Sequence, residues 1–225
     1  HTGVTATGIE PDGAGDGVVV ELSDGTTLSA ERLLVATGRR TDLAGLGVDT
    51  VGVDPDQRFL PVDDRLRVAD GLWAVGDITG KGLFTHVGIH QAGVAVADIR
   101  DGDGPMADYR AVPRVTFTDP EVGSVGLSEQ AARDTGIDVA TALVSVPGTA
   151  RGWLHMHGNE GFIKLVADVD REVLVGATSV GPHGGEVLGL LSLAVHAAVP
   201  LDTLRSMIYA YPTFHKGIED ALREL

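Results

Sequence analysis

The fold of this chain is decided by the stretch Gly71-Leu72-Trp73-Ala74-Val75-Gly76-Asp77. Four consecutive apolar residues, Leu72 to Val75, are typical of a short buried strand. Gly76 lets a ligand approach the backbone, and the Asp77 carboxylate accepts hydrogen bonds from hydroxyl groups. The pattern therefore indicates either a ligand site at the carboxyl end of a strand or an ordinary strand followed by a turn.

Two further segments extend this pattern in both directions along the chain. Upstream, Arg32–Ala36 is another short apolar run, which we expect to form a buried strand that ends in a loop at Thr37-Gly38-Arg39-Arg40. Downstream, Phe84–Arg100 carries apolar and small residues at helical spacing and is followed by Gly102. A helix so rich in small residues can pack closely against a sheet or a flat ligand.

The surrounding residues predict connections and one hairpin. Val18–Leu22 and Thr26–Leu28 flank a Ser-Asp-Gly turn, which is typical of a β-hairpin. Residues 41–67 are rich in Gly, Asp and Pro, so we expect a surface connection with one short strand at Phe59–Val62. The segment Asp101–Pro105 concentrates helix breakers and is the predicted boundary to a second unit.

After this boundary, hairpin-linked strands are followed by helices, which is typical of an α+β layer architecture. Ser128 offers an N-cap to a short helix that Gly136 ends. The predicted strands are Val112–Thr118, Val122–Leu127, Ala140–Val146, Gly161–Ala167 and Val173–Val180. The predicted helices are Glu129–Thr135, Gly185–Ala198, Leu201–Met207 and Thr213–Leu225. The predicted fold class is therefore α/β plus α+β.

Composition excludes several classes of function. The 225 residues, 43% hydrophobic, suffice for one large domain or two modest ones. A net charge of −15, from 17 basic and 32 acidic residues, argues against nucleic acid or an anionic membrane surface as a partner. The sequence has no cysteine, so this chain by itself performs no thiol chemistry. No apolar run approaches the roughly 18 residues of a spanning helix, and we expect a soluble, cytoplasmic protein.

Several motifs occur in a specific order along nearly the whole chain. They are Ala36-Thr37-Gly38-Arg39-Arg40, Gly76-Asp77, Pro113–Val122, Gly161–Leu165, Gly181–Glu186 and Tyr211-Pro212-Thr213. In this order they resemble the C-terminal half of the FAD-dependent pyridine nucleotide-disulfide oxidoreductase family, which includes dihydrolipoamide dehydrogenase, mercuric reductase and soluble transhydrogenase. Because the chain begins with His1 and its first residues read like a strand entered midway, we expect it to be the C-terminal part of a longer protein.

The resemblance implies a domain plan, cofactors and partners. Residues 1–38 would be the tail of an NAD(P)-binding domain, residues 39–108 the C-terminal segment of an FAD-binding domain, and residues 109–225 an interface domain that forms a homodimer. The implied cofactors are FAD and NAD(P)H, and the implied remaining partner is a small-molecule electron acceptor.

The resemblance also implies site residues. In relatives, the aspartate of the Ala-Val-Gly-Asp segment binds the ribityl chain of FAD, which assigns this role to Asp77, with Gly76 giving access. Backbone amides at the start of the next helix would face the pyrimidine edge of the flavin, where a helix N-terminus favours the negative charge that builds up on reduction. These amides belong to Leu83, Phe84 and Thr85. Gly38 is expected near a nucleotide.

One motif departs from the pattern of the thiol-handling members. These members carry His-Pro-Thr followed by a glutamate, and this histidine of the partner subunit is the general acid and base for the dithiol. Here Tyr211 replaces the histidine and Lys216 the glutamate. Because a phenol with a pKa of about 10 does not shuttle protons at neutral pH, we expect hydride transfer from NAD(P)H through flavin to an acceptor without histidine-assisted dithiol exchange. Tyr211 and Tyr209 either contact the acceptor or pack with satisfied hydroxyls.

Two elements of the family have no counterpart, which keeps a second hypothesis open. Neither Gly13–Gly17 nor Gly45–Gly47 fits the Gly-x-Gly-x-x-Gly cradle for the FAD pyrophosphate, and the redox cysteine pair is missing. The alternative is a noncatalytic dimerisation module, or a truncated half that needs a separate FAD-binding chain. A third hypothesis, a metal-binding protein that uses His155 and His157, lacks a carboxylate at ligand spacing.

Overall fold

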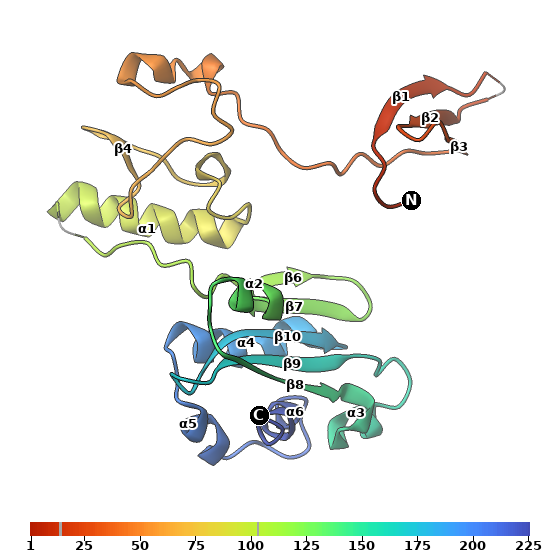
Figure 1. The fold of residues 1–225 in the computed structure, drawn as a ribbon, viewed down its shortest axis with the longest axis vertical. Helices are drawn as coiled ribbons and strands as arrows, with labels where there is room; N and C mark the ends of the chain where they lie inside the picture. Colours follow the sequence, from red (N-terminus) through yellow and green to blue (C-terminus); the bar gives the residue numbers. More distant parts are fainter. Residues whose placement is uncertain (14, 103) are drawn as a thin grey trace. The chain divides into compact units, whose positions relative to one another are not determined.

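The computed structural model describes residues 1–13, 15–102 and 104–225, which form two compact units, residues 1–42 and residues 43–225 (Figure 1). The predicted fold class, α/β plus α+β, is confirmed by the mixture of helices and sheets. Two segments considered in the sequence analysis include residues outside the described ones: Gly13–Gly17, which was compared with the pyrophosphate cradle, contains Ala14, and the predicted boundary segment Asp101–Pro105 contains Asp103.

The first unit is a three-stranded antiparallel sheet in the order β1-β2-β3, with strands Ala6–Pro11, Val18–Leu22 and Thr27–Ala30. The predicted hairpin is thus confirmed. Its turn contains Gly25 at φ +84°, and the Asp24 carboxylate accepts a hydrogen bond of 2.9 Å from the Thr26 amide. This hydrogen bond lowers the pKa of Asp24.

The predicted buried strand at Arg32–Ala36 was wrong for this chain. The segment is not a strand, and its side chains are exposed, Leu34 at 88% and Val35 at 65%. An isolated strand has no hydrogen bonds within itself and forms only beside a neighbour. No strand among the described residues pairs with this segment. The short strand predicted at Phe59–Val62 is also absent, and Leu60 donates a backbone hydrogen bond to the Ile78 carbonyl (2.9 Å).

The second unit opens with short elements that lead into one long helix. They are the 3₁₀ helices η1 (Ala44–Leu46) and η2 (Val48–Val51), the strands β4 (Arg67–Ala69) and β5 (Leu72–Trp73), the 3₁₀ helix η3 (Asp77–Thr79) and helix α1 (Thr85–Asp101). The strand predicted at Leu72–Val75 is shortened to two residues because, within the described chain, its sheet partner is the three-residue β4. Helix α1 matches its prediction within one residue and ends at Gly102 in a left-handed conformation.

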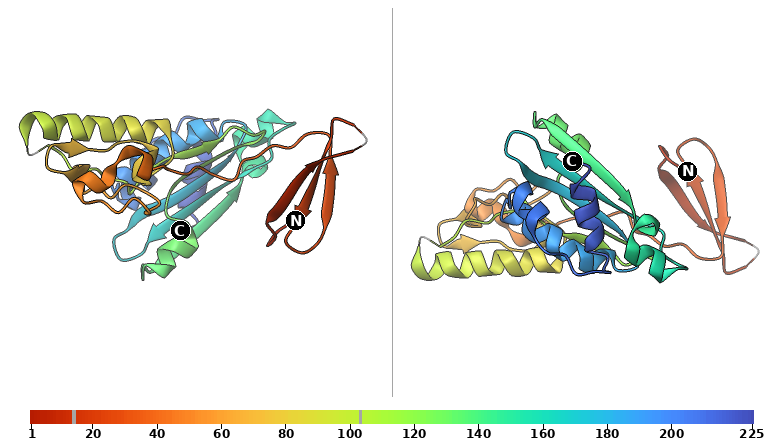
Figure 2. Two further views of the ribbon diagram at one scale, coloured as in Figure 1. Left: turned by 90° about the horizontal axis from the view of Figure 1, so that it is seen from above. Right: turned by 90° about the horizontal axis from the view of Figure 1, so that it is seen from below.

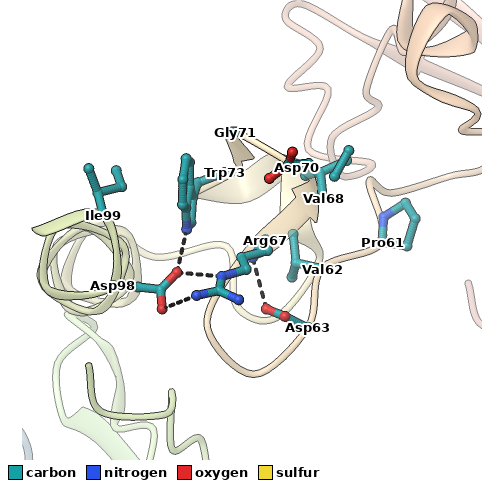
Figure 3. Close-up of a pocket in the computed structure, with 11 residues that line it drawn as sticks. Pro61, Val62, Asp63, Arg67, Val68, Asp70, Gly71, Trp73, Asp98 and Ile99 are labelled. Atoms are coloured by element: carbon teal, nitrogen blue, oxygen red, sulfur yellow. Dashed lines mark hydrogen bonds and ion pairs between the residues drawn. The ribbon is translucent and has the colours of Figure 1, made fainter. Parts of the chain in front are cut away.

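The buried carboxylate of Asp98 ties β4 and β5 to the C-terminal half of α1 through a partly exposed cluster (Figure 3). Asp98 accepts hydrogen bonds from Nε and Nη2 of Arg67 at 2.6 and 2.7 Å and from Nε1 of Trp73 at 2.9 Å. The Arg67 guanidinium holds the pKa of Asp98 below its usual range. A cavity of about 760 Å³, lined also by Asp63 and Asp70, lies beside this cluster.

The remainder of the second unit is a five-stranded antiparallel sheet in the order β6-β7-β10-β9-β8. Its strands are β6 (Arg114–Thr116), β7 (Glu121–Gly126), β8 (Val139–Ser145), β9 (Phe162–Asp168) and β10 (Val173–Gly181). Its helices are α2 (Glu129–Asp134), α3 (Ala150–His155), α4 (Gly184–His196), α5 (Leu201–Ser206) and α6 (Lys216–Leu222), with the short η4 (Val146–Gly148) before α3. Every predicted strand after residue 105 has an observed counterpart.

The two faces of this sheet pack against different helices. Side chains alternate along a strand, so Ile163, Leu165 and Ala167 of β9 point to one face and Val166 to the other. The first face packs against α4, α5 and α6 and forms the main hydrophobic core, and Figure 2 shows these blue helices gathered on one side of the sheet. Val166 packs with Ala132 of α2 on the opposite face. One face of the sheet is therefore covered by three helices, whereas α2 covers the other face only around Val166 and leaves Leu143 of β8 56% exposed.

Two details of this domain differ from the sequence predictions or refine them. The last helix begins at Lys216 instead of Thr213, and α3 was not predicted. The predicted capping of α2 is confirmed, because the Ser128 side chain accepts a hydrogen bond from the Ala131 amide (3.2 Å) and Gly136 follows at φ +83°.

Candidate functional site

The Gly76–Asp77 turn has a backbone conformation that only glycine adopts readily. Gly76 has φ +85° and ψ −158°, and a Cβ atom at this position would meet no atom of the described residues within 4 Å. The backbone is thus open to an approaching ligand. Asp77 is half-buried and begins η3, which ends when the Gly80 amide donates to the Asp77 carbonyl (3.1 Å).

The turn is held from behind by the side chain of Gln91, which is fully buried. Its Oε1 accepts a hydrogen bond of 2.6 Å from the Gly76 amide, and its Nε2 donates to Thr79 Oγ1 at 2.9 Å and to the Tyr109 hydroxyl at 3.0 Å. Thr79 in turn donates its hydroxyl proton to the Gly76 carbonyl (2.9 Å). Both backbone polar groups of Gly76 are therefore fixed by side chains.

Helix α1 lies directly against this turn. A Cβ atom on Gly88, one turn into the helix, would lie 3.5 Å from the Gly76 Cα. This is an ordinary van der Waals distance, so the helix backbone at Gly88 lies close to the turn. The two candidate features that the sequence predicted separately, the Gly76–Asp77 turn and the start of α1, are brought together in the structure.

The start of α1 is a helix N-terminus whose first turn holds no acidic residue. Phe84 is the N-cap residue in an extended conformation (φ −130°, ψ 143°), and no side chain of the described residues caps the helix. The first amides of a helix have no acceptor within it, and the helix dipole places positive potential there. The amides near Thr85, whose side chain is exposed, can therefore bind a group that carries partial or full negative charge.

His86 is engaged in local packing. Its Nε2 lies 2.9 Å from the Pro113 carbonyl oxygen, and its ring stacks on Phe84 with 5.1 Å between the ring centroids. These contacts connect the first turn of α1 to the segment that enters β6. They indicate a structural role for this histidine.

A largely apolar cavity of about 510 Å³ adjoins the N-terminus of α1. It is lined by Phe84, Thr85, His86, Pro113, Val115, Phe117, Gly185, Leu188, Gly189 and Ser192. The Oγ of Ser192 is buried there without a hydrogen-bond partner among the described residues. The cavity therefore runs from the proposed ligand-facing end of α1 to helix α4.

Two further predicted site residues, Gly38 and Tyr211, belong to other parts of the chain. Gly38 belongs to the first unit, where it is exposed at φ +104°. Tyr211 lies in the loop between α5 and α6 with a side chain that is 73% exposed. Lys216, at the position of the family's glutamate, forms an ion pair with Glu219.

Tyr209 does not share the exposure of Tyr211. It is 8% exposed, its hydroxyl donates to the Leu204 carbonyl (3.0 Å), and burial raises the pKa of its phenol. Tyr209 therefore packs with a satisfied hydroxyl, which is the second of the two interpretations given for the tyrosines.

Sequence reasoning missed Gln91, Thr79 and Tyr109 as parts of the site. The available signal was a polar residue on the apolar face of α1, where Gln91 lies between the buried Val87 and Val94. A buried amide needs hydrogen-bond partners, so this position predicts a tertiary network. Which residues complete it depends on the fold.

Neither a metal site nor a membrane span emerges from the residues that the structure describes. No group of three or more His, Cys, Asp or Glu side chains among them is placed to hold a metal ion. In the same residues, no helix has the length and apolar character needed to cross a bilayer.

Two family models match successive parts of the chain. Residues 1–98 match the model described as pyridine nucleotide-disulphide oxidoreductase, and residues 112–222 match the dimerisation domain of the same family. Among curated relatives, dihydrolipoyl dehydrogenase of Thermus scotoductus is 33% identical over 230 residues, which cover 100% of this chain and 49% of the relative. Dihydrolipoyl dehydrogenase of Synechocystis is 35% identical over 240 residues, covering 99% of this chain and 50% of the relative.

Solved structures give the same result. LpdA from Mycobacterium tuberculosis matches with a TM-score of 0.86 and 26% identity, over 98% of this chain and 48% of that chain. The HOCl-induced flavoprotein disulfide reductase RclA from Escherichia coli matches with a TM-score of 0.82 and 26% identity, over 97% of this chain and 50% of that chain. The chain thus spans about half the length of the relatives it matches.

Proposed function

Because the chain belongs to the pyridine nucleotide-disulfide oxidoreductase family, we propose that it is the C-terminal portion of an FAD-dependent oxidoreductase. The complete enzyme would move a hydride from NAD(P)H through the flavin to a small-molecule acceptor. The observation that carries this proposal is the open glycine turn before Asp77, which is held against the N-terminus of α1.

The residues present fit one part of FAD. The open side of Gly76 gives space for a close approach, and the Asp77 carboxylate can accept hydrogen bonds from the ribityl hydroxyls. The residues described do not supply the cradle for the pyrophosphate. Gly45 and Gly47 lie in and after the 3₁₀ helix η1, and no α-helix of the described residues opens directly after them. The chain therefore supplies a contact for the sugar-alcohol tail and the flavin edge, and the phosphate site requires other residues.

The chemistry divides between the cofactor and this chain. FAD, when bound, supplies the hydride-accepting ring system. Asp77 would orient the ribityl chain, and the amides around Leu83, Phe84 and Thr85 would stabilise negative charge on the pyrimidine edge. Gly38 would lie near a nucleotide. Because these contacts use backbone amides and a carboxylate, they require no proton transfer by this chain.

The nature of the acceptor is connected to Tyr211. The thiol-handling members of the family have a histidine at this position, and this chain has a tyrosine. The exposed side chain is available to contact an acceptor or a partner subunit. We therefore propose that the acceptor half-reaction does not use histidine-assisted dithiol exchange. The choice among a disulfide, mercuric ion, a quinone, oxygen and a second pyridine nucleotide as acceptor would depend largely on residues of the full-length protein outside this chain.

The proposed assembly is a homodimer formed through residues 109–225. The match of residues 112–222 to a dimerisation domain supports this assembly. In the same plan, residues 1–38 end the NAD(P)-binding domain and residues 39–108 end the FAD-binding domain. Cytoplasmic location stays a prediction.

A second candidate function is favoured by the missing phosphate cradle. The 225 residues by themselves would then be a noncatalytic dimerisation module, or a half that needs a separate FAD-binding chain. This hypothesis shares the fold and differs in its cofactor behaviour, because the isolated chain would dimerise without binding flavin.

Purification of the full-length protein and of this chain tests both functions. We expect the full-length protein to be yellow, with a flavin absorption band that bleaches on addition of NADH or NADPH. Full-length protein that stays colourless in the presence of excess FAD would refute the oxidoreductase. Light scattering on the chain of 225 residues then tests the module: a colourless dimer supports it, and a monomer contradicts it.

A further inference from the structure

We propose that Gln91 and Tyr109 are positioning residues that hold the Gly76–Asp77 turn in its flavin-binding conformation and link this turn to the segment entering the dimerisation domain. The proposal rests on the proposed function for the identity of the ligand. The hydrogen-bonded link between the turn and this segment is formed only by residues of this chain.

The side chain of Gln91 uses both ends of its buried amide for hydrogen bonds. Its oxygen accepts from Gly76, and its two amide protons go to Thr79 and Tyr109. A buried side chain that offers one acceptor and two donors is an amide, so neither an apolar residue nor a carboxylate can replace it without loss of bonds. Since Gln91 is fully buried, each lost bond leaves a group without solvent as a substitute.

The Gly76 conformation explains why this support is needed. Glycine in an unusual φ and ψ region has many alternative conformations, because it lacks a Cβ atom. The amide of Gly76 is fixed by Gln91 and its carbonyl by Thr79, so rotation on either side of the residue breaks a hydrogen bond. The direction in which Asp77 leaves the turn follows from these two bonds. Gln91 therefore acts on the ligand through Gly76.

Through its hydroxyl, Tyr109 connects the Gln91 hydrogen bonds to the segment that follows α1. Tyr109 lies between α1 and β6, and its ring also packs edge-on against His90 with 6.3 Å between centroids. Four residues later, the Pro113 carbonyl contacts His86 of the same helix. Three positions of α1, His86, His90 and Gln91, thus contact the segment 109–113. A shift of this segment would change the Gln91 amide and, through it, the turn.

The consequence is a dependence of FAD affinity on residues that need not touch FAD. Removal of the Tyr109 hydroxyl leaves one Gln91 proton unpaired and loosens the amide, while the bond to Gly76 can still form. Replacement of Gln91 by methionine, which has a similar length, removes all three bonds. The effect of Tyr109→Phe should disappear when Gln91 is already replaced, because the hydroxyl acts through the amide.

The experiment measures two quantities in each variant. The first is the dissociation constant of FAD for full-length apoprotein, from the quenching of flavin fluorescence. The second is the hydrogen exchange of the Gly76 amide in the full-length protein without FAD. We expect Tyr109→Phe to weaken FAD binding about 3–10-fold and Gln91→Met at least about 10-fold, and the double variant to match Gln91→Met. Gly76 exchange should accelerate in all three variants.

Matched controls remove the same groups elsewhere. Gln130→Met deletes a surface amide that bonds to Asp134, and Tyr209→Phe deletes a buried hydroxyl in the C-terminal domain. Both should keep the wild-type FAD affinity and Gly76 exchange. Unchanged Gly76 exchange in Tyr109→Phe, or additive losses of affinity in the double variant, would overturn the proposed link. If wild-type protein binds no FAD, the proposed function fails, and the exchange rates alone then decide the link.

Discussion

Replacement of Gly76 by alanine tests the conformation on which the candidate site depends. At φ +85° and ψ −158° a residue with a Cβ atom is strained, and such strain costs about 1–3 kcal/mol. No atom of the described residues lies within 4 Å of the position that the Cβ atom would take, so steric clash adds nothing in the chain itself. For a chain of this size, 1 kcal/mol corresponds to about 2–4 °C in Tm. The expected loss is therefore about 2–12 °C.

The open side of Gly76 predicts a second, separate effect of the same substitution. The added methyl group would occupy space in which the proposed ligand approaches the backbone, so FAD affinity should fall further than the change in stability explains. The assays are thermal unfolding of this chain and FAD titration of the full-length apoprotein.

Gly136→Ala is the matched control for this substitution. Gly136 also has a positive φ (+83°), and a Cβ atom there would have no neighbour of the described chain within 4 Å, but this glycine lies after α2. The variant should lose stability by about 1 kcal/mol and keep its FAD affinity. Wild-type stability of Gly76→Ala would refute the backbone argument, and equal FAD affinity in the two variants would refute the ligand argument.

Three further predictions concern other groups in the chain. Because the pKa of Asp98 is lower in the folded than in the unfolded state, its contribution to stability is present above about pH 4 and is lost as the pH falls through the pKa of the folded state. Asp98→Asn should lower Tm at about pH 7 and make stability depend less on pH in the acid range. An unchanged pH dependence in the acid range would contradict this prediction. Ser192→Ala removes a buried hydroxyl that has no partner among the described residues and should be neutral or stabilising by about 1 kcal/mol in urea unfolding, whereas a destabilisation of that size would mean that the hydroxyl is satisfied. Tyr211→His in the full-length protein should add a titration at about pH 6.5 to the proposed acceptor half-reaction, and the presence of this titration already in wild type would contradict the proposal for Tyr211.

The parts of the fold that could be predicted are those fixed by local sequence. Antiparallel hairpins such as Phe162–Asp168 with Val173–Gly181 pair residues that are close in the chain, and alternation marks which side chains face the core. Helix α2 carries its own start and stop signals, Ser128 and Gly136. In such cases the apolar pattern and the turn residues contain nearly all the information that the fold uses.

The two wrong strands failed for one physical reason. Arg32–Ala36 and Phe59–Val62 have the composition of buried strands, yet a strand exists only if another strand offers its hydrogen bonds. Leu72–Val75 shows the intermediate case, since its two residues that meet β4 are a strand and the next two are not. The identity of a partner strand is a property of the whole fold and is not encoded in the segment.

The candidate site likewise has parts that could be predicted from the sequence and parts that could not. Asp77 and the start of α1 could be predicted, because glycine, carboxylate and helix signals occur in a recognisable order. The network of Gln91 could not, because it joins Gly76, Thr79 and Tyr109 across 15, 12 and 18 positions of the chain. Only its existence was implied, by an amide on an apolar helix face.

The buried face of α1 therefore orders the site through two polar residues. Asp98 binds Arg67 and Trp73 and fixes the strands that precede the turn, while Gln91 fixes the turn itself. Both sets of bonds form within this chain, so the direction of Asp77 is set before any phosphate-binding residues take part. A contact that is already ordered costs less entropy when a ligand arrives. It follows that the proposed flavin-tail contact of this chain is preorganised, and that its disruption should weaken cofactor binding even when the phosphate site is intact.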